Sequence, residues 1–138
     1  MMKCFGWDYN SSRRTIAPAP AMPDFLVELR AIACNQSARD SGQFEQAIVT
    51  WYPAGYGIGA HCDADVFGDP VLGFSFAATA TMTFYRGSES FNLALRPRSL
   101  LVMSGPSRSE WAHEIAGRSV RAPRWSVTFR SVLKPTKS

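Results

Sequence analysis

A succession of short strand-like segments fills the C-terminal two thirds of the chain and constrains its fold more than any other feature. Apolar and polar residues alternate within the segments, and glycine, proline or small polar residues separate one segment from the next. Short strands parted by turns are typical of a β-sandwich or a β-barrel. The strands that we expect are 46–52, 58–63, 71–78, 80–86, 91–95, 99–103, 108–113 and 124–132.

One helix is expected before these strands. Pro23 is a favourable first helical residue, and the acidic Asp24 follows it. Apolar residues then recur at helical spacing to about Gln36, which predicts a helix that packs on a sheet. These residues are Phe25, Leu26, Leu29, Ile32 and Ala33. We expect a short strand at 4–9 and, because it contains three prolines, a loop at 10–23.

Length and composition fit a single domain that occupies residues 1–138. Apolar residues make up 46% of the 138 residues, enough for one core. The sequence indicates neither a signal peptide nor a membrane span. The three cysteines have no metal-finger spacing, so we expect a reducing, cytoplasmic location. We also expect a monomer.

Positive charge is concentrated in the C-terminal third. Residues 96–138 hold nine Lys or Arg against two Glu, whereas residues 1–95 hold six against nine Asp or Glu. This asymmetry is compatible with a polyanionic partner. The simpler alternative is an ordinary solvated surface.

A possible metal site lies in the segment TWYPAGYGIGAHCDAD, residues 50–65. His61 and Asp63 are two residues apart, and in an extended chain this spacing directs both side chains to one face, with Cβ atoms roughly 7 Å apart. The only other histidine is His113. Two histidines and one carboxylate form the facial triad of non-haem Fe(II) oxygenases. The alternative is that His61 is a turn residue and His113 a half-buried strand residue.

A second candidate site lies in the last expected strand, within PRWSVTFRSV. Alternation places Trp125, Val127 and Phe129 on one face, and Arg124 and Arg130 on the other. Guanidinium groups bind carboxylates through two parallel hydrogen bonds, so the two arginines could close on a small dicarboxylate. The alternative is that both arginines are solvated.

Both candidate sites belong to a set of six sequence blocks spread along nearly the whole chain: FGWDYNS, PAPAMPDFL, YPAGYGIGAHCDAD, VLGFSFAA, PRSLLVMSGPSRSEWAH and RWSVTFR. In content, order and spacing they resemble the AlkB-like 2-oxoglutarate- and Fe(II)-dependent dioxygenases. The candidate ligands fall on two strands and the arginines on a third. We therefore expect a mainly β (α+β) fold, a double-stranded β-helix or jelly roll, with the one N-terminal helix packed on a sheet.

The resemblance implies a role for each candidate residue. The expected iron ligands are His61, Asp63 and His113. Arg124 is expected to pair with the distal carboxylate of 2-oxoglutarate, Arg130 to lie near its metal-bound end, and Tyr52 to donate a hydrogen bond to it. Family members often carry Asn at the positions of Thr50 and Ser126, and both of these can still hydrogen-bond to the co-substrate.

The residues expected to bind substrate are less clearly matched. We expect a shorter N-terminal lid than in the family. Its base-stacking aromatic has no clear counterpart, although Trp7 or Tyr9 stands near that place. The loop at 10–23 is expected to lie over the site. Asp65, two residues past Asp63, would share its face if the chain stays extended, and could contact the edge of a flipped base.

The implied activity is oxidative demethylation of N-alkylated nucleobases in DNA or RNA, with Fe(II), 2-oxoglutarate and O2. The products are formaldehyde, succinate and CO2. A methylated base must leave its stack, so single strands are the expected partner. One alternative is the same chemistry on a modified tRNA base or a methylated protein side chain. Another, from a different class, is a catalytically silent jelly roll that binds nucleic acid.

Overall fold

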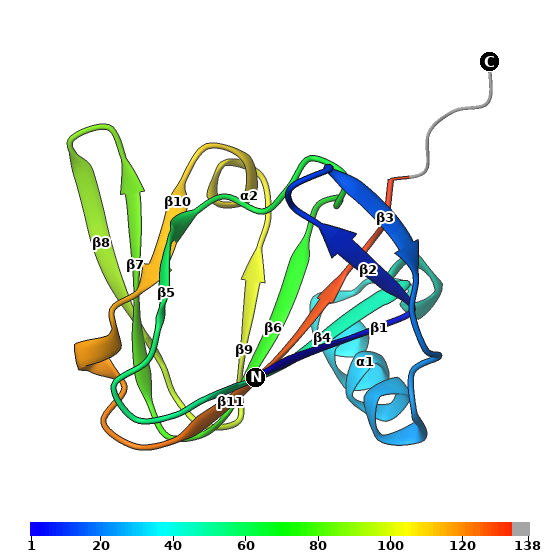
Figure 1. Ribbon diagram of the computed structural model, residues 1–138, viewed down its shortest axis with the longest axis horizontal. Coiled ribbons are helices and arrows are strands. Elements are labelled where there is room, and N and C mark those ends of the chain that lie inside the picture. The colour runs from blue at the N-terminus through cyan, green and yellow to red at the C-terminus, as the bar shows by residue number, and fades with distance from the viewer. Residues whose placement is uncertain (134–138) are drawn as a thin grey trace.

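Two antiparallel sheets face each other in the computed structural model, which describes residues 1–133 (Figure 1). The larger sheet has the order β1 (Met2–Phe5), β4 (Gln46–Tyr52), β11 (Arg124–Arg130), β6 (Val71–Ala77), β9 (Ser99–Met103). The smaller has the order β5 (Ile58–His61), β10 (Ala112–Ile115), β7 (Ala80–Arg86), β8 (Glu89–Leu95). A hairpin of β2 (Trp7–Asn10) and β3 (Thr15–Pro18) forms a separate two-stranded sheet. This is the expected mainly β, jelly-roll architecture.

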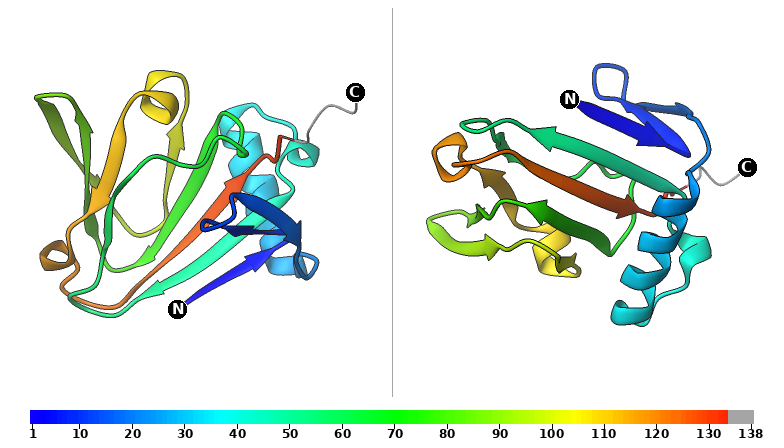
Figure 2. Two further views of the ribbon diagram at one scale, coloured as in Figure 1. Left: turned by 45° about the horizontal axis from the view of Figure 1, so that its top comes forward. Right: turned by 90° about the horizontal axis from the view of Figure 1, so that it is seen from below.

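The helix α1 (Asp24–Ser37) packs on the outer side of the larger sheet, away from the smaller sheet (Figure 2). Its buried residues Leu26 and Ala33 meet Leu72 and Phe129 of the sheet. The buried set differs from the predicted one, because Phe25 is 55% and Ile32 48% exposed. Helical periodicity predicts which residues form the apolar face of the helix. How many of them the sheet buries depends on the orientation of the helix on the sheet.

A second apolar layer fills the space between the sheets and includes Met82, Phe84 and Met103. Successive side chains of β11 point to opposite faces of the larger sheet. Val127 and Phe129 are buried beneath α1, and the alternate residues point into the space between the sheets: Arg124, Ser126, Thr128 and Arg130. Trp125 is the exception on the apolar face, with 40% of its surface exposed beyond the helix.

Several expected boundaries are wrong. The strand expected at 108–113 is a short helix, α2 (Pro106–Ser109), followed by β10, because Pro106 favours a helical first turn. The strand expected at 4–9 is divided at Gly6, whose φ is +78° and whose Cα lies against the Glu45 carbonyl, leaving no room for a side chain. The loop expected at 10–23 contains β3. Short 3-10 turns occupy Ser41–Gln43 and Gly117–Ser119.

The loops between the two sheets gather at opposite ends of the molecule. At one end of the larger sheet, Arg124 is the register partner of both Tyr52 and Ala77. The chain crosses between the two sheets at this end. We call this the distal end, lower in Figure 1; its loops are 53–57, 78–79, 96–98 and 116–123. The opposite end carries the loops 62–70, 87–88 and 104–111. No helix among the described residues is long and apolar enough to cross a membrane.

Candidate metal centre and co-substrate pocket

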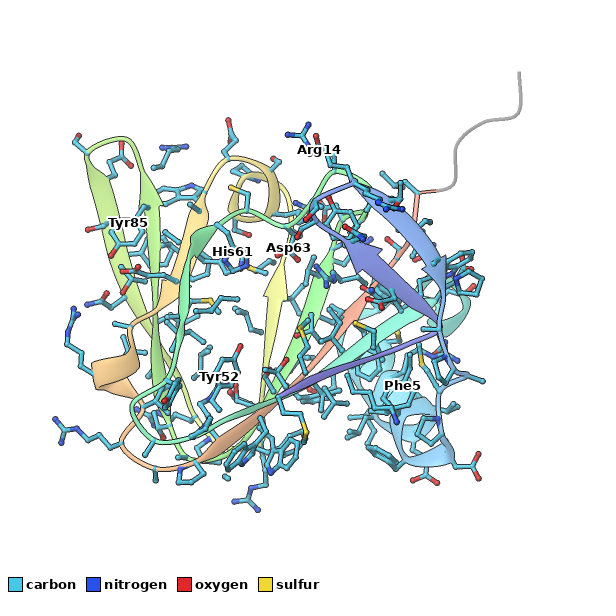
Figure 3. All side chains as sticks on the ribbon, in the orientation of Figure 1. Phe5, Arg14, Tyr52, His61, Asp63 and Tyr85 are labelled. Atoms are coloured by element: carbon cyan, nitrogen blue, oxygen red, sulfur yellow. The ribbon has the colours of Figure 1, made fainter. Side chains whose placement is uncertain are left out.

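His61 and His113 come from neighbouring strands and point at the same carboxylate. They are register partners on β5 and β10, with ring centroids 4.4 Å apart. The Nε2 atom of His61 lies 3.9 Å from Asp63 Oδ1, and that of His113 lies 3.7 Å from the same oxygen. One donor atom from each residue lies within 4.8 Å of the others. Figure 3 shows His61 and Asp63 together at the end opposite the distal loops.

Hydrogen bonding fixes which nitrogen of His61 is free. Its Nδ1 lies 2.8 Å from the carbonyl oxygen of Gly59, which can only accept, so Nδ1 carries the proton. In the neutral ring this leaves the lone pair on Nε2, the atom that faces Asp63. At His113, burial and then the neighbouring His61 lower the pKa of the imidazole. The lowered pKa favours the neutral form of His113, which is the form that metal binding requires.

Asp63 lies beyond the end of β5, in the loop 62–70, and Arg108 of α2 holds this loop. The Arg108 side chain is buried and donates hydrogen bonds to four carbonyl oxygens of the loop, those of Asp63, Ala64, Phe67 and Gly68, at 2.7 to 3.3 Å. In return, the backbone amide of Gly105 donates to the Asp69 carboxylate at 2.7 Å. The two loops are therefore tied together, and the position of Asp63 depends on α2.

Arg124 is a buried cation with spare donors. It is 1% exposed, and within residues 1–133 its one side-chain hydrogen bond runs from Nη2 to Ser75 Oγ at 3.1 Å. Its Nε and Nη1 are buried without a partner among the described residues. The guanidinium carbon lies 5.0 Å from the centre of the Tyr52 ring, and burial lowers the pKa of the guanidinium. A buried charge without a counter-ion raises the free energy of the folded protein, so this position favours the binding of an anion.

A cavity of about 290 Å³ joins Arg124 to the His–Asp–His cluster between the sheets. Thr50, Tyr52 and Ser126 also line it. Arg130, at the other end of β11, donates from Nη1 to Asp63 Oδ2 at 3.4 Å and from Nε to Gln46 Oε1 at 3.0 Å. The alternative of two solvated arginines is wrong, because β11 turns both into the cavity.

A family model, the 2OG-Fe(II) oxygenase superfamily, matches residues 3–130. The chain belongs to this superfamily. Its fold is similar to the solved structure of OsALKBH1, with a TM-score of 0.69 and 19% identity over 94% of this chain and 77% of that one.

Among curated relatives, bovine DNA oxidative demethylase ALKBH2 is 30% identical over 147 residues, which cover 96% of this chain and 51% of the relative. The mouse tRNA (carboxymethyluridine(34)-5-O)-methyltransferase ALKBH8 is 27% identical over 134 residues, which cover 94% of this chain and 20% of the relative. The chain spans between about a fifth and about three fifths of the length of the relatives it matches. Within the superfamily it is an AlkB-like oxygenase.

The cofactors of this class, Fe(II), 2-oxoglutarate and O2, fit the donors that this AlkB-like oxygenase presents. Two imidazoles and one carboxylate suit non-haem Fe(II) and leave other coordination positions open. The two unpartnered nitrogens of Arg124 suit a carboxylate of 2-oxoglutarate. Both sets of donors face one cavity, so the metal and co-substrate would be neighbours.

The residues expected to bind substrate lie outside this cavity. The chain turns after Asp63, where the amide of Phe67 donates to the carbonyl of Ala64 at 3.0 Å, so the premise of an extended chain through Asp65 is wrong. Asp65 is exposed in that turn. Tyr9 packs edge-on against Phe67, with ring centroids 5.6 Å apart. Trp7 is half-buried, and its Nε1 lies 3.4 Å from Glu45 Oε2.

The hairpin β2–β3 therefore packs on the loop that carries Asp63, and Arg14 in its turn lies at the same end as Asp63 in Figure 3. Sequence reasoning assigned no role to Arg108. The local segment GPSRSE carries no signal for this role, because the hydrogen bonds of Arg108 join α2 to a loop far earlier in the chain.

Proposed function

We propose that this AlkB-like oxygenase removes N-methyl groups from nucleobases oxidatively and releases formaldehyde, succinate and CO2. The observation that carries the proposal is the cavity itself, in which a His–Asp–His cluster and a buried arginine with two unpartnered nitrogens face each other. The names of the ALKBH2 and ALKBH8 relatives, a DNA demethylase and a tRNA modification enzyme, support nucleic acid as the substrate.

In this proposal His61, Asp63 and His113 hold the iron. Arg130 and the histidines orient Asp63, because Arg130 donates to Oδ2 while Oδ1 faces both rings. Iron, 2-oxoglutarate and O2, when bound, supply the oxidant that hydroxylates a methyl C–H bond. The hydroxymethyl group on the base nitrogen then breaks down to formaldehyde and the repaired base.

The co-substrate would lie along β11, with its distal carboxylate on Arg124 and Tyr52. Thr50 and Ser126 line the cavity beside them and offer short hydroxyl donors. The apolar side chains between the sheets exclude water from the reacting centre. The open end beside Asp63 is left for the base, which favours a single strand because unstacking there costs least.

The test is turnover with matched substrates. Succinate and formaldehyde are measured with Fe(II) and 2-oxoglutarate on single strands that carry 1-methyladenine or 3-methylcytosine, on an unmethylated strand, on a modified tRNA and on a methylated peptide. Equal release of both products on a methylated strand alone supports the proposal. Turnover on tRNA or peptide alone points to the alternatives with the same chemistry. No turnover together with retained binding of nucleic acid points to a silent binding domain.

A further inference from the structure

The distal end of the molecule is uniformly basic. Its four loops, 53–57, 78–79, 96–98 and 116–123, contain four arginines and no Asp or Glu. The arginines are Arg96, Arg98, Arg118 and Arg121. All four are exposed, and none forms an ion pair within residues 1–133. The other arginines of the C-terminal third are already engaged: Arg108, Arg124 and Arg130 are turned inward.

A groove of about 800 Å³ leads away from this end along the outer face of the smaller sheet. Arg118 and Arg121 stand at the groove with Ser119. The rest of its lining is small or neutral and polar, and consists of Ala78, Thr79, Ala80, Thr81, Thr83, Asn92, Ala116 and Ala122. A carboxylate on the neighbouring strand, Glu114, accepts a hydrogen bond from the Tyr85 hydroxyl. Guanidinium, hydroxyl and amide donors are the groups that contact phosphate oxygens in nucleic-acid complexes.

Exposed aromatic side chains occur in or next to the same loops. Tyr56 in the loop 53–57 is 66% exposed, and Trp125, just after the loop 116–123, is 40% exposed and lies beside Trp51. Basic side chains interleaved with aromatic rings are the usual means of holding a single strand without sequence preference, because every base has a face on which a ring can stack.

We propose that the distal end and its groove form a second contact surface for the phosphodiester backbone of a single-stranded nucleic acid. The strand's alkylated base would occupy the metal pocket. This inference rests on the proposed function. The two ends are separated by about one strand length, roughly 20 Å for the seven residues of β11. A short oligonucleotide therefore reaches only the pocket, whereas a longer one reaches both surfaces.

The test compares long and short strands in matched variants. The probe is a fluorescent, unmethylated single-stranded DNA of about 20 nucleotides, whose binding is measured by anisotropy over a range of salt concentrations. Arg118→Gln/Arg121→Gln removes two charges from the groove. Lys3→Gln/Arg39→Gln removes two charges from exposed positions outside it. The first variant should bind about 10-fold more weakly, and its slope of log K against log salt should fall by about 1.4, which is two phosphate contacts.

The control variant should keep the wild-type slope and affinity, and Arg118→Lys/Arg121→Lys should restore most of the binding. Turnover of a methylated trinucleotide should be the same in all variants. An equal loss in both double glutamine variants, or no loss in either, overturns the second surface. Failure of the proposed function is seen separately, as absence of turnover on the trinucleotide.

Discussion

His61 and His113 face each other across neighbouring antiparallel strands, with ring centroids 4.4 Å apart, although they are 52 positions apart in the sequence. Their Nε2 atoms point at one oxygen of Asp63. The strand register and the hydrogen bond from His61 Nδ1 to the Gly59 carbonyl hold the rings in place.

Alanine at any one of the three positions should abolish Fe(II)-dependent turnover and weaken Mn(II) or Co(II) binding strongly, because two ligands hold a divalent ion poorly. Metal titration of Asp63→Ala and His113→Ala measures this, and circular dichroism checks that the fold is retained. Full activity of His113→Ala would contradict the assignment.

Arg124→Lys should raise the concentration of 2-oxoglutarate needed for half-maximal turnover roughly 10- to 100-fold, because an ammonium group cannot replace a bidentate guanidinium in a buried pocket. Metal affinity should stay normal, since Arg124 makes no contact with the His–Asp–His cluster. Ser126→Ala is the control, with a smaller effect. If neither Arg124→Lys nor Arg130→Lys changes the 2-oxoglutarate dependence, the pocket does not bind the co-substrate.

Arg108→Ala should loosen the loop 62–70 and weaken Mn(II) binding about 10-fold, the size of effect seen when partners of metal ligands are removed. Guanidinium ion at millimolar concentration should restore part of the affinity by filling the vacated site, whereas a general loss of stability would not be rescued. Arg86→Ala, at an exposed arginine, is the control. Unchanged metal affinity with a lowered Tm would show that Arg108 only stabilises the fold.

The three cysteines should differ in reactivity. Cys62 is exposed and Cys34 is buried. Burial, then the charge of Asp8 and its hydrogen bond, raise the pKa of Cys4 to about 11. A thiol reagent near pH 8 should therefore label Cys62 first, and Cys62→Ser should lose that reaction. Because the raised pKa favours the neutral thiol in the folded state, stability should fall as the pH rises from about 9 toward 11. Equal labelling of Cys4 and Cys62 would contradict this.

Asp65→Ala should slow demethylation of cationic lesions such as 1-methyladenine more than that of a neutral lesion, if the carboxylate offsets the charge of the methylated ring. The side chain is exposed in the turn after Asp63, at the same end as the metal cluster. Turnover on single strands that carry each lesion measures the difference. An equal loss on both, or no loss, would leave base selection to residues 10–23.

The sequence alone determined the layered β fold and which side chains of a strand share one face. Alternation along 124–130 already separated the arginines from Val127 and Phe129, because side chains on a strand alternate between two faces whatever the strand packs against. The H-x-D spacing likewise identified the residues that could share one metal, and helical periodicity located α1.

Only the tertiary structure decided what depends on contacts between distant segments. The register of β10 against β5 brings His113 opposite His61, and burial between the sheets leaves Arg124 with unpartnered donors. The turn after Asp63 removes Asp65 from the extended face, and Arg108 fixes that turn through four carbonyl oxygens. Local sequence carries no information on these pairings, because each one is set by the packing of elements that lie far apart along the chain.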